Sequence, residues 1–280
     1  MTTTAASTPR GDAVRSSRDQ ITGVAWFVGL TLAFATAATI AAVSSRADPN
    51  LLAFPLAFAP AVIAIGLAWR EGDGAVARLV GQLRVLPRNP ILYGVLLIPL
   101  AAFLAVDIVA IALGEPVAGL FDNLFPAVVI VPLVVLLPAI TEELAWRGFA
   151  IPRALTVMSP LRAALVLGVP WTLIHIGLFL PGQMNAGAAY WSMATQIMSM
   201  SVVLVWVYLV TGRSVLMAAL VHALFNGLVP LAGGVEPGLA WAIRGVVWPV
   251  MAIAIVAFGG YRHLEAIGSA PARSSESKPA

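Results

Sequence analysis

The chain contains 280 residues, of which 60% are hydrophobic and only 10% are charged. A soluble protein carries about 25% charged residues, so 16 basic and 13 acidic side chains are too few to cover a soluble fold of this length. Cysteine is absent, which excludes disulfides, cysteine-ligated metal sites and thiol nucleophiles. The basic residues are scattered between apolar runs and form no patch, so nucleic acid is not an expected partner. The composition predicts a protein whose solvent is the lipid bilayer.

Residues 1–20 are polar and are expected to form a disordered cytoplasmic segment. Beyond them, the chain repeats runs of about 20 apolar residues, the length that crosses a hydrocarbon layer about 30 Å thick. Eight runs qualify, which predicts an all-α fold, a polytopic bundle of about eight transmembrane helices. The predicted spans are 21–43, 51–69, 91–113, 125–149, 161–180, 190–210, 214–232 and 239–260.

The distribution of Lys and Arg predicts the orientation, because cytoplasmic loops retain positive charge. With the N-terminus inside, 14 of the 16 basic residues fall on the cytoplasmic side, and only Arg46 and Arg244 do not. Arg244 is expected to snorkel outward from the last span. Residues 74–85 alternate Arg with Val and Leu, which predicts a basic amphipathic helix on the inner leaflet. We expect a multi-pass protein of a bacterial plasma membrane with both termini in the cytoplasm.

A small set of ionisable or amide side chains lies within the predicted spans. Such groups cost about 2.5 to 3.5 kcal/mol each in hydrocarbon, so they are candidates for function. The sequence leaves two roles open for Asp107, which is either a wall of the substrate cavity or a structural contact. The set comprises Asp107, Glu142, Glu143, Arg147, His175, His222, Asn226 and Arg244.

Three pairs in this region are four residues apart and therefore share a helix face: Glu143 with Arg147, Trp171 with His175, and His222 with Asn226. Glu142 and Glu143 point about 100° apart. We expect Glu143 to pair with Arg147, because two unpaired buried charges would be costly. Glu142 is then expected to face the bundle interior unpaired, where a desolvated carboxylate is a candidate general base.

Counted from the cytoplasmic ends of their helices, His222 lies about 12 Å deep and His175 about 20 Å deep. The predicted site is therefore open to the cytoplasm. A carboxylate, two imidazoles and an amide suit the addition of water to an acyl group. Glu142 would activate the water with His175, while His222 and Asn226 would stabilise the oxyanion.

The sequence does not contain the residues that other mechanisms of intramembrane proteolysis require. The zinc motif H-E-x-x-H is absent, since Ile-Gly-Leu follows His175 and Ala-Leu-Phe follows His222. Ser192, Ser199 and Ser201 lie within a predicted span, but none has a Gly-x-Ser setting. Ser214, which follows Gly212 and Arg213, lies at a cytoplasmic helix start and is better interpreted as a helix N-cap. A paired-aspartate mechanism would need a second buried Asp besides Asp107.

Three motifs resemble those of the CPBP intramembrane protease family, which includes the CAAX prenyl endopeptidases of the Rce type and the bacterial Abi proteins. They are Glu142-Glu143-Leu144-Ala145-Trp146-Arg147 for E-E-x-x-x-R, Trp171-Thr172-Leu173-Ile174-His175 for F-x-x-x-H, and His222-Ala223-Leu224-Phe225-Asn226 for H-x-x-x-N. The resemblance covers about residues 126–230. It implies that Glu142 and His175 activate water, that His222 and Asn226 support the oxyanion, and that Glu143 and Arg147 are structural. Trp171 departs from the usual Phe, which puts the shape of the pocket in doubt.

The predicted spans and the resemblance together divide the chain into 1–20 (disordered cytoplasmic N-terminus), 21–124 (N-terminal spans with the amphipathic helix), 125–232 (catalytic core), 233–262 (last span) and 263–280 (disordered cytoplasmic tail). The leading hypothesis is an endopeptidase acting on a membrane-embedded or lipidated peptide, with CAAX-type prenylated proteins as one class. It requires no cofactor, whereas zinc bound by Glu142, His175 and His222 is the alternative. The competing functions are a proton-relaying transporter and a non-catalytic scaffold or immunity protein.

Overall fold

The computed structural model describes residues 16–45, 48–117, 135–228 and 235–261. Every regular element within these ranges is helical, and the prediction of an all-α polytopic bundle is confirmed. The predicted disordered tail at 263–280 and the first 15 residues lie outside the described ranges.

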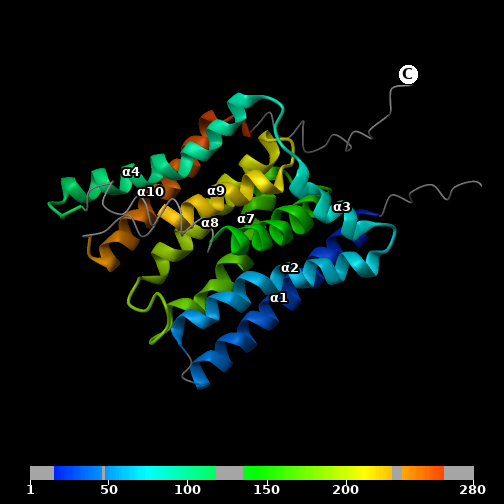
Figure 1. The fold of residues 1–280 in the computed structure, drawn as a ribbon, viewed down its shortest axis with the longest axis horizontal. Helices are drawn as coiled ribbons and strands as arrows, with labels where there is room; N and C mark the ends of the chain where they lie inside the picture. Colours follow the sequence, from blue (N-terminus) through cyan, green and yellow to red (C-terminus); the bar gives the residue numbers. More distant parts are fainter. Residues whose placement is uncertain (1–15, 46–47, 118–134, 229–234, 262–280) are drawn as a thin grey trace, which may run out of the picture.

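The first half of the chain supplies two long helices, a short surface helix and a third long helix (Figure 1). In chain order the elements are α1 (Ser17–Ser45), η1 (Pro49–Leu52), α2 (Ala53–Glu71), α3 (Ala75–Gly81), η2 (Gln82–Arg84), η3 (Pro90–Leu96) and α4 (Leu97–Ala112). Helix α1 begins earlier than the predicted boundary at residue 20, because Ser16 Oγ accepts a hydrogen bond from the backbone N–H of Asp19 (3.2 Å) and caps the helix.

The second half of the chain begins with a continuous helical segment over residues 135–154, here called the Glu142 helix. It contains the π-helical stretch η4 (Leu144–Ala150) and ends in α6 (Ile151–Ala154). The remaining elements are α7 (Pro160–His175), η5 (Ile176–Phe179), α8 (Tyr190–Val210), α9 (Val215–Leu228) and α10 (Pro237–Phe258).

Six helical stretches are long and apolar enough to cross a membrane, and they match the first, second, third, fifth, sixth and eighth predicted spans. The fourth predicted span corresponds to the Glu142 helix, whose predicted start at residue 125 lies outside the described residues. The seventh corresponds to α9, which has 14 residues and ends where the described range ends. The chain is an integral multi-pass membrane protein by these criteria.

Helix α8 lies in the middle of the bundle, where it packs most extensively against α10 and α7 (Figure 1). Its 21 residues extend about 31 Å, close to the thickness of the hydrocarbon layer. Helices α1 and α2 pack together on one side, and α4 packs against α9 and α10 on the other.

Consecutive long helices run in opposite directions, so the bundle has two distinct ends. The first end, here called the arginine end, contains the start of α1, the end of α2, α3, the start of α7 and the end of α8 (Figure 1). An ion pair ties it together, since Arg153 Nη2 lies 2.7 Å from Glu71 Oε2. The opposite end contains the end of α1, the start of α2, η5 and the starts of α8 and α10. The rings of Phe179 and Trp241 pack edge to face there, with centroids 5.0 Å apart.

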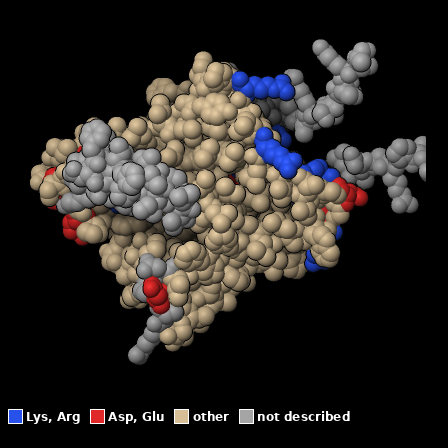
Figure 2. Space-filling model, viewed as in Figure 1, with Lys and Arg blue, Asp and Glu red and all other residues tan. Residues whose placement is uncertain are grey.

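Charge is distributed unequally between the two ends. Figure 2 shows most of the basic side chains at the upper right and right, where acidic side chains also lie, whereas acidic side chains mark the left and the bottom of the view. The described basic residues at the arginine end are Arg18, Arg70, Arg78, Arg84, Arg88, Arg153, Arg162 and Arg213. The opposite end carries Asp48, Glu115 and Glu236.

The start of α10 at this opposite end is capped by an acidic side chain. The backbone N–H groups of Gly238 and Leu239 donate to the Glu236 carboxylate at 2.8 and 2.7 Å. These two hydrogen bonds stabilise the anion and lower the pKa of Glu236. Pro237 follows at the first helical position, where its missing N–H is not needed.

The predicted amphipathic segment at 74–85 is helical, as α3 and η2. Ala75 and Leu79 are buried against the bundle. Gln82 Nε2 donates to the Gly148 carbonyl (3.0 Å), and Gln82 Oε1 accepts from the Tyr208 hydroxyl (3.0 Å). One amide thereby joins the surface helix to the Glu142 helix and to α8. Its place on the inner leaflet stays a prediction.

A close contact between α8 and α10 depends on a glycine. An ideal Cβ on Gly245 would lie 2.8 Å from Ser192 Cα, a backbone atom that cannot move aside cheaply. Nearby, Thr195 Oγ1 donates to the Gly245 carbonyl at 2.9 Å. Small residues of this kind allow membrane helices to approach closely.

We therefore expect Gly245→Ala to separate α10 from α8 and to destabilise the protein by about 1 to 3 kcal/mol. Gly66→Ala on α2 is the matched control, because a Cβ there meets nothing within 4 Å. Thermal unfolding of both purified variants in detergent measures the difference. Equal melting temperatures would contradict this account of the α8–α10 contact.

Candidate active site

The Glu142 helix, α7 and α9 bring the predicted site residues together. Glu143 Oε1 lies 3.0 Å from Arg147 Nη1, and these side chains are 0% and 1% exposed. The predicted pairing of Glu143 with Arg147 is confirmed. It satisfies two charges one helical turn apart in a fully buried position.

The same carboxylate oxygen of Glu143 also contacts a second helix. His222 Nδ1 on α9 lies 2.9 Å from Glu143 Oε1. A carboxylate only accepts hydrogen bonds, so the His222 proton is placed on Nδ1 and Nε2 is left for another partner. Sequence reasoning missed this bond, because the distance between two helices has no counterpart in residue spacing.

Glu142 points away from the Glu143–Arg147 pair, toward α7. Its Oε2 accepts a hydrogen bond from Trp171 Nε1 (2.8 Å), so the prediction of an unpaired Glu142 is wrong. The reason is the Trp at a position where the resemblance anticipates Phe, since an indole N–H is a donor and a phenyl ring has none. The carboxylate is 6% exposed and keeps further acceptor positions.

His175 lies on the other side of the same carboxylate. Its Nε2 is 4.0 Å from Glu142 Oε2. Its Nδ1 is 2.7 Å from the Trp171 carbonyl oxygen, which can only accept, so the neutral ring carries its proton on Nδ1. The lone pair of Nε2 is thereby directed toward Glu142.

Trp171 is packed at the centre of this cluster. Its ring meets His222 and His175 edge to face, with centroids 5.6 and 6.0 Å apart. The Arg147 guanidinium carbon lies 4.4 Å from the ring centroid, a favourable cation–π distance. Trp171 thus packs against Arg147 and against both imidazoles and holds them in position.

The widened π-helical turn at Leu144–Ala150 lies directly after the two glutamates, and all seven of its residues are buried. Such turns are frequent at functional sites. Gly148 lies within it, and a Cβ there would lie 3.0 Å from Leu79 Cδ1 on α3. Sequence reasoning did not predict this stretch. One feature of the sequence indicates it. In an α-helix the N–H of residue 152 would donate to the Gly148 carbonyl, but Pro152 has no N–H.

A cavity of about 400 Å³ opens above this cluster. Glu142, Trp171, His175, His222 and Asn226 line it together, so the structure brings the five predicted residues to one space. Its remaining wall is mostly apolar and comprises Ala53, Phe54, Leu56, Ala57, Val135, Pro138, Leu178, Phe179, Met184, Asn185, Gln196, Ile197, Met200, Phe225 and Trp241.

The cavity lies toward the end of the bundle opposite the arginine end, and the predicted opening to the cytoplasm stays a prediction. Its walls come from the start of α2, the end of α7 with η5, the first half of α8 and the start of α10. These parts lie at the end opposite the arginine end, which the charge rule assigns to the cytoplasm. Packed side chains fill the bundle between the cavity and the arginine end. The depth of a residue along its own helix does not predict this packing.

Residues 124–228 match the family model described as type II CAAX prenyl endopeptidase Rce1-like. These residues are therefore similar to the Rce1-like family. The match confirms the resemblance stated for about residues 126–230, and it covers less than half of the 280-residue chain. No curated protein matches the chain.

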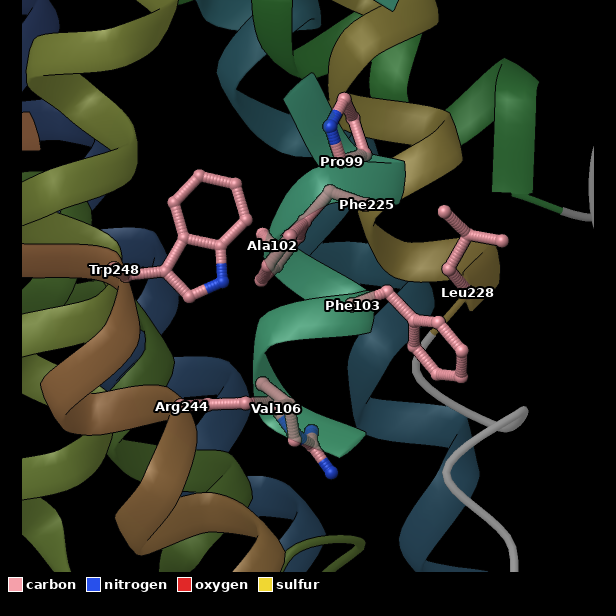
Figure 3. Close-up of a pocket in the computed structure, with 8 residues that line it drawn as sticks. All are labelled: Pro99, Ala102, Phe103, Val106, Phe225, Leu228, Arg244 and Trp248. Carbon is pink, nitrogen blue, oxygen red and sulfur yellow. The ribbon is translucent and has the colours of Figure 1, made fainter. Parts of the chain in front are cut away.

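Besides the Glu143–Arg147 pair, two more ionisable residues of the predicted set, Asp107 and Arg244, lie outside the cavity. Asp107 is half-buried on α4 and is not among the residues that line the cavity. Arg244 was expected to snorkel outward, but it is 7% exposed and lines a separate void of about 20 Å³ with Val106 and Trp248 (Figure 3). Its guanidinium carbon lies 5.0 Å from the Trp241 ring centroid, and this contact keeps it within the bundle.

The donor set of the zinc alternative was Glu142, His175 and His222. Within the described part of the chain, no three His, Asp or Glu side chains are grouped so that they could hold a metal ion. As placed in the structure, Glu142, His175 and His222 therefore do not form a three-ligand zinc site.

Arg147→Met is expected to destabilise the protein by about 3 to 5 kcal/mol, because it leaves the Glu143 carboxylate buried without a cation. Arg162→Met is the matched control, since Arg162 is exposed at the same end of the bundle. Thermal unfolding in detergent provides the comparison. The double variant Glu143→Gln/Arg147→Met removes both charges and should recover part of the loss; no recovery would argue against the ion pair as the cause.

Proposed function

We propose that this protein is an intramembrane peptidase that hydrolyses a peptide bond of a membrane-associated substrate, with Glu142 as the base. One observation carries the proposal. The acceptor atoms Glu142 Oε2 and His175 Nε2 lie 4.0 Å apart at the wall of a cavity large enough for a peptide segment.

A water molecule that donates one hydrogen bond to each of two acceptors spans a gap of about 4 to 4.5 Å. A water between Glu142 and His175 would direct both protons at these groups. Both of its lone pairs are then free to attack a carbonyl carbon. Glu142 takes the proton as the new C–O bond forms and later returns it to the leaving amine.

The oxyanion formed by this attack needs donors on the other side of the carbonyl. Asn226 offers a side-chain N–H₂ from α9. His222 offers Nε2 when its ring carries a second proton, and the Glu143 carboxylate at Nδ1 stabilises that imidazolium. Glu143 and Arg147 support these groups without touching the substrate.

The apolar wall favours a substrate with large hydrophobic groups. Phe54, Phe179, Phe225 and Trp241 surround the space above Glu142. The description of the matching family names CAAX prenyl endopeptidases, so lipidated peptides are one class to be tested beside unmodified apolar segments.

Glu142→Gln tests the proposed base. The Gln carbonyl still accepts from Trp171 Nε1, so folding should be retained while the rate of cleavage falls by about 10² to 10⁴. Comparative proteomics of cells that express either form would show fragments that disappear in the variant. Glu115→Gln is the matched control, because Glu115 follows α4 away from the cavity.

The two competing functions predict different results for the same variant. A transporter would lose flux across reconstituted vesicles in Glu142→Gln and would generate no fragments with either form. A scaffold would keep its phenotype in Glu142→Gln. Either outcome would refute a peptidase.

Chelation tests the zinc alternative separately. We expect cleavage by the purified protein to be unchanged by 1,10-phenanthroline, because the proposed mechanism uses Glu142 and His175 without a metal. Loss of cleavage that added zinc restores would instead assign Glu142, His175 and His222 as ligands. The closely related non-chelating 1,7-phenanthroline controls for direct inhibition.

A further inference from the structure

Residues 75–88, here called the α3 segment, form the connection at the arginine end that follows α2 (Figure 1). This segment has two distinct faces. Its inner face is buried against the bundle and comprises Ala75, Leu79 and Pro87. Its outer face is exposed and combines cations with aliphatic side chains, namely Arg78, Val80, Arg84, Leu86 and Arg88.

The aliphatic side chains of the outer face are well exposed, with Val80 at 40% and Leu86 at 52%. Each of them lies two residues away from an arginine. A mixture of this kind is typical of a segment in the plane of the membrane surface, where aliphatic groups contact acyl chains and cations contact headgroups. The outer face therefore suits a lipid better than it suits water alone.

Two arginines of the outer face have no acidic partner in the described part of the chain. Arg84 and Arg88 take part in none of the ion pairs found there. Other acidic residues of this end are engaged elsewhere, since Glu71 lies 2.7 Å from Arg153 and Asp19 accepts a hydrogen bond from a serine at the start of α1. An anion from outside the protein can therefore bind these guanidinium groups.

The third arginine is oriented by the turn that precedes α3. Arg78 Nη1 donates to the backbone carbonyl of Asp73. With this Asp included, residues 73–88 contain three Arg and one Asp, which gives a net charge of +2. The surface remains positive and attracts anionic headgroups.

The inner face of the α3 segment contacts the π-helical stretch of the Glu142 helix. Gln82 Nε2 donates to the Gly148 carbonyl at 3.0 Å, and a Cβ on Gly148 would lie 3.0 Å from Leu79 Cδ1. In α-helical register this carbonyl would have residue 152 as its donor, but Pro152 has no N–H. Gln82 thus supplies a hydrogen bond that the proline removes from the Glu142 helix.

We propose that the outer face of the α3 segment binds the phosphate of an anionic phospholipid, and that Gln82 transmits this binding to the π-helical stretch Leu144–Ala150. The phosphate contacts the arginines, while the acyl chains contact Val80 and Leu86. A bound lipid holds the segment against the bundle and keeps Gln82 on the Gly148 carbonyl. The inference concerns a lipid site outside the cavity and does not depend on the proposed peptidase function.

Native mass spectrometry of the full chain in detergent tests the lipid site, with phosphatidylglycerol as the anionic probe and phosphatidylcholine as the zwitterionic one. Arg84→Gln/Arg88→Gln removes two exposed cations and should leave the fold intact. Arg18→Gln/Arg162→Gln is the matched control, because both arginines are exposed at the same end outside the α3 segment.

We expect phosphatidylglycerol to bind the unmodified protein more tightly than phosphatidylcholine. Each arginine removed from the site should weaken that binding about fivefold, and the control variant should change it less than twofold. Equal affinity for the two lipids would overturn the proposal, and so would equal losses in the two double variants. Displacement of phosphatidylglycerol by millimolar glycerol phosphate would assign the site to free phosphate instead of a lipid.

Hydrogen exchange of residues 144–150 tests the transmission through Gln82. Phosphatidylglycerol should slow exchange there in the unmodified protein. Gln82→Leu should bind the lipid with unchanged affinity and show no slowing. Each protein is compared with itself with and without lipid, so a general loss of stability in the variant does not produce this result. Slowing that persists in Gln82→Leu, or no slowing in the unmodified protein, would overturn the transmission.

Discussion

The arrangement of the site depends on one buried carboxylate. Glu143 Oε1 is bonded to Arg147 within its own helix and to His222 on α9. Burying this charge is costly unless it is paired and hydrogen-bonded. The two helices are therefore held in the one register that gives the carboxylate both partners, and Trp171 adds α7 by packing against Arg147 and His222.

This use of Glu143 gives the neighbouring Glu142 a different environment. The helical period turns Glu142 away from the cation and toward the cavity, where Trp171 Nε1 holds one oxygen and His175 lies nearby. Two adjacent carboxylates thus have separate tasks, since one is neutralised in a packed layer and the other borders open space. Environments that differ in this way commonly separate structural from reactive carboxylates.

Helix positions were predictable from sequence because the bilayer imposes both length and apolar composition. The pairing of Glu143 with Arg147 was predictable because four residues make one helical turn. Bonds between helices were not, and the contacts of His222 with Glu143 and of Trp171 with Glu142 appear only once the helices are packed. The packed layer around Trp146 and Arg147 was not predictable either, because it is built from several helices, whereas depth along α7 and α9 was counted one helix at a time. The opening of the site to the cytoplasm stays a prediction.

The cavity places its ionisable groups on the floor and mostly aromatic, Met and aliphatic side chains along its walls. The polarity of such a space increases from its apolar walls to its ionisable floor. In the proposed peptidase, a peptide that passes the phenyl and thioether groups would lose its hydration before its scissile amide reaches the few groups able to retain a water molecule. Water would then be confined to the point of attack.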